Sequence, residues 1–192
     1  MNVRELPDGY RLIGAIDLQK DPKSVRVISL MAVAIGIACY FVGRMRTPIG
    51  NTFLFSGRFS ASAVRISCAF ACMFLYLILH EWIHGVFIRF LGKVKPKYGY
   101  EGIYLYAGTD QAWFDRKSYI VIALAPIVVW GLVLGFISWI SADDWFWVFY
   151  FVQIINLSGS AGDLFITVKM LRMPAGTLVQ DTGTAMAFYG RG

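Results

Sequence analysis

Charged residues are scarce in this chain of 192 residues, at 16% of the sequence, whereas hydrophobic residues make up 57%. Soluble globular domains usually carry about 25% charged residues and about 45–50% apolar ones. The shortage of charge therefore argues against a soluble domain and indicates a protein that lives in a membrane.

Cysteine and histidine are also rare. The three cysteines, Cys39, Cys68 and Cys72, lie in apolar runs without a CxxC or disulfide spacing, which indicates small core residues. The two histidines fall within one short stretch. The start of the chain lacks a basic segment followed by an apolar region and a cleavage site, so we expect no cleaved signal peptide.

Long apolar runs are what the sequence has in abundance. They predict four membrane-spanning helices, at about residues 27–42, 66–90, 119–140 and 145–168. A helix needs roughly 20 apolar residues to cross the hydrocarbon core, so the last three qualify and the first is short. We expect one all-α membrane domain over residues 1–192, with small cytoplasmic β segments.

Positive charge is distributed unequally between the loops. With the N-terminus inside, only Arg44, Arg46, Arg58 and Arg65 lie outside, and the loop between the last two spans holds Asp143 and Asp144 but no Lys or Arg. This positive-inside pattern predicts a multi-pass membrane protein with both termini in the cytoplasm. The net charge of +6 is then explained by basic residues beside the lipid bilayer, and we expect no nucleic-acid partner.

Several shorter segments remain between and beside the spans. Residues 44–65 contain "RTPIGNTFLFSGRFS", which is apolar for a loop and too short to span as a helix, so a re-entrant or interfacial segment and an ordinary exported loop are all open. Residues 9–18, 97–108 and 176–189 alternate apolar and polar side chains between turn residues, as strands do. All three lie on the cytoplasmic side, where they form either a small sheet or independent tails.

The stretch "YLILHEWIHGVFIRF" places ionisable residues inside the second span. His-Glu-x-x-His on a helix puts His80 and His84 one turn apart on one face, where both imidazoles can bind one Zn²⁺. Glu81 points to the neighbouring side, where it can accept the proton of a water on the metal.

An accidental match, with both histidines hydrogen-bonded in a core, is the alternative to a metal site. It is disfavoured because the sequence has no other histidine, and because Glu81 and Asp163 are the only acidic residues deep within the predicted spans. Ionisable residues inside a membrane are costly, so their presence indicates a function.

A catalytic zinc usually takes three protein ligands, and Asp163 in "NLSGSAGDLF" is the intramembrane candidate for the third. His84 lies five residues before Arg89, and Asp163 lies six before Lys169. At about 1.5 Å per residue, both are roughly 8–9 Å from these cytoplasmic markers. The sequence therefore predicts that the two side chains lie at similar depth.

The fourth span also carries a polar stripe. Its members follow steps of three and four residues, which keeps them on one helical face: Gln153, Asn156, Ser160, Asp163 and Thr167. Helix–helix hydrogen bonding explains such a stripe, but for Asn156 we expect a role in binding substrate or orienting a ligand. Pro126 predicts a kink in the third span.

The sequence resembles the bacterial putative zincin peptidases, a family similar in plan to the site-2 intramembrane metalloproteases. The resemblance covers nearly the whole chain, through "LPDGYRLIGAIDLQKD", "HEWIHG", "NLSGSAGD" and "LVQDTG". It implies His80, His84 and Asp163 as zinc ligands and Glu81 as the catalytic acid and base. The site-2 pattern has a Pro where Gly159 stands, and its Asn lies one residue farther from the Asp than Asn156 does.

These features favour a zinc-dependent peptidase that cleaves a membrane protein or peptide substrate within or beside the bilayer. A catalytically inactive zinc-binding adaptor is the alternative, although structural zinc does not need a base such as Glu81. A zinc transporter would need further ligands along a path. An aspartyl intramembrane protease would need a second membrane aspartate beside Asp163.

Overall fold

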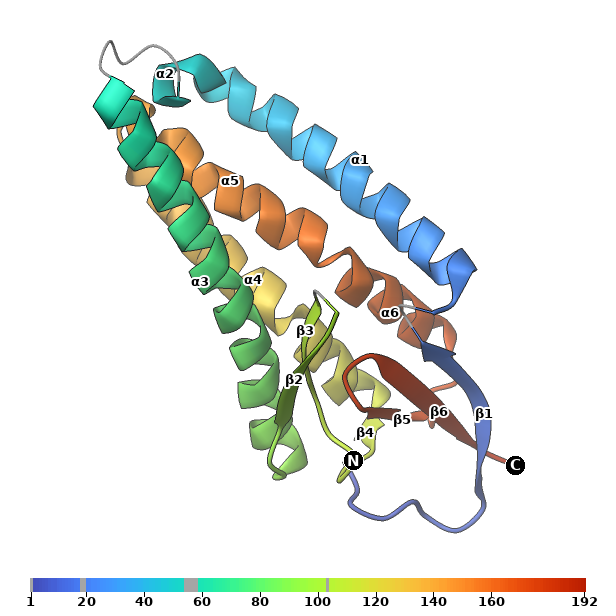
Figure 1. Cartoon of the computed structure of the whole chain (residues 1–192). Coiled ribbons are helices and arrows are strands. Elements are labelled where there is room, and N and C mark those ends of the chain that lie inside the picture. Colours follow the sequence, from blue (N-terminus) through green and yellow to red (C-terminus); the bar gives the residue numbers. More distant parts are fainter. Residues whose placement is uncertain (1, 18–19, 54–58, 103) are drawn as a thin grey trace. The chain divides into compact units, whose positions relative to one another are not determined.

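The computed structural model describes residues 2–17, 20–53, 59–102 and 104–192 (Figure 1). The helices are α1 Pro22–Arg46, α2 Ile49–Phe53, α3 Phe59–Gly92, α4 Arg116–Ile140, α5 Asp143–Gly159 and α6 Ala161–Arg172. The strands are β1 Tyr10–Asp17, β2 Lys97–Glu101, β3 Tyr104–Gly108, β4 Phe114–Asp115, β5 Leu178–Asp181 and β6 Ala185–Arg191.

Four helical stretches in the described part of the chain are long and apolar enough to cross a membrane. They are Pro22–Arg46, Ser60–Gly92, Arg116–Ile140 and Asp143–Arg172. Each contains one of the predicted spans and extends beyond it, because a helix continues through polar residues while its backbone hydrogen bonds are made. The first is therefore not short. Its 25 residues are enough for a crossing.

The fourth stretch is divided at Ser160 into α5 and α6, where the sequence predicted one span. Gly159, Ser160 and Gly162 are all weaker helix formers than alanine, and they meet at this point. The division places Asp163 in the first turn of α6. Negative charge is stabilised there by the unpaired backbone amides of a helix N-terminus.

Strands form two sheets. β1, β6, β5 and β4 are hydrogen-bonded in that order, each pair antiparallel, and β2 and β3 form a separate hairpin. The predicted segments 9–18 and 176–189 thus share a sheet, whereas 97–108 does not join it. Gly183 permits the tight turn between β5 and β6, since its φ is +112°. Residues 18 and 103 of these segments lie outside the described residues.

Residues 44–65 contain the short helix α2 between the ends of α1 and α3. The Thr52 hydroxyl donates to the backbone carbonyl of Asp143 at 3.4 Å, and the Arg65 guanidinium donates to the carbonyl of Thr52 at 3.2 Å. These bonds tie α2 to the start of α5. Residues 54–58 lie outside the described residues, and the re-entrant arrangement stays a prediction.

The chain divides into two compact units, each built from separated segments. The first unit comprises residues 1–28, 79–126 and 162–192, and the second comprises 29–78 and 127–161. In the first, a buried core joins strands to helix ends, with Phe114, Val179 and Phe188 packed with Ile88 and Met170. The second has a smaller core around Tyr76, Leu134 and Val152. The single domain over residues 1–192 stays a prediction.

Candidate metal centre

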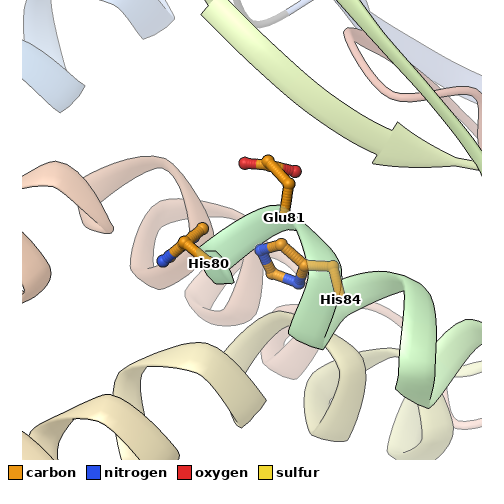
Figure 2. A group of neighbouring side chains, drawn as sticks. All are labelled: His80, Glu81 and His84. Atoms are coloured by element: carbon orange, nitrogen blue, oxygen red, sulfur yellow. The ribbon is translucent and has the colours of Figure 1, made fainter. Parts of the chain in front are cut away.

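The second half of α3 presents the predicted motif from one turn of helix. The ligand atoms of His80, Glu81 and His84 lie within 4.8 Å of one another. Figure 2 shows the three side chains leaving the same turn, with the Glu81 carboxylate standing apart from the two imidazoles. This is the arrangement that a spacing of four residues and 3.6 residues per turn produces.

Asp163 lies opposite the two imidazoles, within the same unit of the fold. His80 Nε2 is 3.5 Å from Asp163 Oδ2, and His84 Nε2 is 3.5 Å from Asp163 Oδ1. Each imidazole side chain is 11% exposed, and the Asp163 side chain is 23% exposed. The structure therefore brings together the two histidines and the aspartate that sequence depth selected.

The spacing of these atoms fits a shared metal ion. Ligands at about 2.0–2.1 Å from a tetrahedral zinc are separated from one another by roughly 3.3 Å. The two nitrogen–oxygen distances of 3.5 Å are close to that value. Two imidazole nitrogens and a carboxylate oxygen are also donors that zinc accepts, and three such ligands leave a fourth position for a reactant.

His84 is held from its other side by α4. Its Nδ1 lies 3.0 Å from the backbone carbonyl oxygen of Ile122. A carbonyl can only accept, so Nδ1 carries a proton, and whenever the ring is neutral Nε2 presents a lone pair. That lone pair faces the carboxylate of Asp163, and two acceptors at 3.5 Å repel unless a cation or a proton lies between them.

Glu81 faces the β2–β3 hairpin rather than α6. Its carboxylate interacts with the backbone amide of Ala107 on β3. The hydroxyl of Tyr98 on β2 rests against Gly85, where a Cβ atom would lie only 1.9 Å from it. Burial, and then the charge of Glu81, raise the pKa of Tyr98. The hairpin thus packs on the turn that carries the motif, and Gly85 makes room for it.

Asn156 lies in the second unit, whereas His80, Glu81, His84 and Asp163 lie in the first. Its side chain is fully buried, accepts a hydrogen bond from the Tyr76 hydroxyl at 3.1 Å and donates to the carbonyl of Ile127 at 3.4 Å. Such bonds are those of a polar seam between membrane helices. The predicted role of Asn156 toward substrate or ligand stays a prediction.

A buried carboxyl group in the sheet was not found from the sequence. Asp181, at the end of β5, accepts hydrogen bonds from the Tyr119 hydroxyl at 2.5 Å and from the amide of Gly183 at 2.8 Å. Tyr119 stands one turn before Ile122 on α4, so the pair supports the helix that contacts His84. The signal was present in "LVQDTG", where an Asp before Thr-Gly predicts a turn with a side-chain acceptor.

Asp181 gives the protein a pH-dependent stability. Burial raises the pKa of its carboxyl group to about 6, from an ordinary value of 3.8. Between these values the folded chain keeps a proton that the unfolded chain has lost, so the free energy of unfolding falls as pH rises from about 4 to about 6. The decrease amounts to at most about 3 kcal/mol.

We expect Asp181→Asn to remove this contribution, because the amide keeps one acceptor for Gly183 and can donate to the Tyr119 oxygen. Thermal unfolding in detergent micelles at several pH values checks it. The difference in stability between the variant and the parent should change between pH 4 and pH 6 and stay constant above pH 7. A difference that does not vary with pH would contradict the assignment.

The centre thus consists of His80, His84, Asp163 and Glu81, and it defines a candidate zinc site. The chain belongs to the family described as "Putative zincin peptidase", whose model matches residues 73–178. The matched region contains all four residues of the centre. The description of this family names a class of peptidases, the zincins, that use zinc.

One similar protein is the uncharacterized 24.7 kDa protein in the gap 5' region of Pyrococcus woesei. It is 30% identical over 119 residues, which cover 59% of this chain and 51% of that protein. The chain thus spans about half the length of the curated relative it matches. No solved structure matches the chain.

Proposed function

We propose that this protein is a zinc-dependent peptidase that hydrolyses peptide bonds within or beside a membrane. The observation that carries the proposal is the meeting of His80, His84 and Asp163, with both Nε2 atoms 3.5 Å from the carboxylate and Glu81 on the same turn of α3. Family membership supports the reaction class. The long apolar helices support the membrane location.

Each residue of the centre has a separate task. His80, His84 and Asp163 would hold the zinc ion, which when bound supplies Lewis acidity and lowers the pKa of water toward neutrality. Glu81 accepts the proton of the attacking water and later delivers it to the leaving amine. The backbone amide of Ala107 and the packing of the hairpin keep the Glu81 carboxylate oriented.

The hairpin beside Glu81 suggests how a substrate is presented. β2 and β3 pair only with each other among the described strands, so each leaves an outer edge. An extended segment of a membrane protein or peptide can add to such an edge through main-chain hydrogen bonds. Addition to β3 would place the segment near Glu81, because Ala107 lies on that strand.

The length of α3 bears on the depth of the centre. At about 1.5 Å per residue its 34 residues span roughly 50 Å, more than the ~30 Å of the hydrocarbon core. His84 lies eight residues before the end of α3. The position of His84 near the end of α3 and the positive-inside distribution together favour a centre near the cytoplasmic face of a bacterial cell membrane. The same arrangement favours the site-2-like plan of intramembrane cleavage.

Metal analysis combined with a proteolysis assay tests the proposal. We expect the protein purified in detergent micelles to carry one zinc ion per chain and to cleave dye-labelled casein. A chelator such as 1,10-phenanthroline should abolish cleavage, and added Zn²⁺ should restore it. Bound zinc without cleavage of casein or of membrane-protein substrates would favour the adaptor instead. Absence of bound zinc would reject both.

A further inference from the structure

α4 contains a proline in its interior and remains helical on both sides of it. Pro126 lies between Arg116 and Ile140, the ends of that helix. Proline has no backbone N–H, so the carbonyl four residues earlier in a helix loses its usual partner. In α4 that carbonyl belongs to Ile122. Ile122 is only 3% exposed, so water does not readily replace the lost hydrogen bond.

The partner that replaces the missing amide is an imidazole of the metal centre. His84 Nδ1 lies 3.0 Å from the Ile122 carbonyl oxygen. The bond requires a proton on Nδ1, so in the neutral ring the lone pair of Nε2 faces Asp163, 3.5 Å away. A hydrogen bond to the second ring nitrogen is the usual means by which proteins fix the tautomer and direction of a metal-binding histidine.

We propose that Pro126 is a positioning residue of the metal centre: by withholding its amide, it leaves the Ile122 carbonyl to His84. The role of Pro126 in metal binding rests on the proposed function, whereas the hydrogen bond between His84 and Ile122 does not depend on it. It gives Pro126 a role beyond the kink expected from its sequence position, which stays a prediction. It also explains how a main-chain carbonyl inside a regular helix is available as an acceptor for a side chain of another helix.

Pro126→Ala tests the proposal, because alanine restores the N–H that competes for the Ile122 carbonyl. The readout is the nitrogen NMR spectrum of metal-free protein labelled in histidine, at a pH high enough that each imidazole is neutral and carries a single proton. The chain has only His80 and His84, so the spectrum contains two imidazoles, and His80→Asn identifies the signals of His84. In the parent we expect the His84 proton on Nδ1. In Pro126→Ala we expect it to move, wholly or in part, to Nε2.

Zinc affinity provides the second measurement, by competition with a chromophoric chelator. Loss of an outer hydrogen bond to a metal-binding histidine typically weakens binding about 10–100-fold, and we expect a decrease in this range for Pro126→Ala. Ala125→Gly is the matched control. It disturbs the same turn of α4 but leaves the Ile122 carbonyl without a helical amide, so the His84 tautomer should match that of the parent.

A merely structural proline would alter thermal stability without moving the imidazole proton. The inference is therefore overturned if Pro126→Ala keeps the parent tautomer and the parent affinity. It is also overturned if the parent itself carries the His84 proton on Nε2, a result that does not depend on whether the variant folds. Failure of the parent to bind zinc would instead reject the proposed function, and the tautomer measurement would still decide the hydrogen bond.

Discussion

Glu81→Gln is expected to abolish proteolysis while the metal stays bound. The amide has nearly the shape of the carboxylate but cannot take a proton from the attacking water. A positioned general acid or base typically contributes about 10²–10⁴-fold to a rate, so we expect kcat to fall by at least about 100-fold. The ligand atoms of His80, His84 and Asp163 are not changed. Turnover of a fixed substrate and zinc content, measured on the same preparation, check both parts.

Glu5→Gln is the control for this change. Glu5 is exposed near the start of the chain and lies outside the centre, so the same chemical substitution should leave both rate and metal content unchanged. Undiminished turnover by Glu81→Gln would reject the mechanism. Loss of zinc together with activity would show that Glu81 acts on the metal site rather than on the proton.

Asp163→Asn is the second substitution with a large expected effect. It removes the negative charge that both imidazoles face at 3.5 Å and replaces a carboxylate with a much weaker amide ligand. Loss of a residue that only hydrogen-bonds to a metal ligand already lowers metal affinity about 10–100-fold, so we expect zinc affinity to fall by about 100-fold or more when a ligand is lost. Proteolysis should be lost at zinc concentrations that saturate the parent.

Asp143→Asn provides a matched control for Asp163→Asn. Both aspartates occupy the first turn of a helix, α5 and α6 respectively, so the substitution removes the same favourable interaction with a helix N-terminus. Asp143 is exposed and faces Arg46 at 3.6 Å, with no histidine involved. Zinc affinity should be unaffected in this control. Unchanged metal content in Asp163→Asn would reject Asp163 as the third ligand.

Local sequence patterns accounted for the four long apolar helical stretches and for the histidine pair of the centre. The four spans follow from apolar runs, because a backbone in lipid must satisfy its hydrogen bonds internally and a helix does so within one segment. His80 and His84 share a face because four residues is close to one turn. The segments predicted from alternation at 9–18 and 176–189 contain β1, β5 and most of β6, whereas the pairing of β1 with β6 did not follow from it.

Asp163 could be named from the sequence because it is a rare acid at the depth of the histidines. Its approach to both imidazoles could not be derived from the sequence, because some 70 residues of chain separate α3 from α6. The packing of these helices sets the distance from the carboxylate to the imidazoles, which is close to the separation of two ligands on one metal ion. The division at Ser160, which places Asp163 at a helix N-terminus, could not be predicted from the sequence pattern either. A polar stripe with steps of three and four is compatible with one continuous helix.

The sequence by itself determined the kind of protein and the chemistry of its parts: apolar helices of membrane length, and a histidine pair with a glutamate between them. These properties are local, since they depend on residues a few positions apart. Only the tertiary structure decided which groups face the centre from other elements. Asp163, the Ile122 carbonyl released by Pro126, and the hairpin beside Glu81 reach it through packing between distant segments, which no local period encodes.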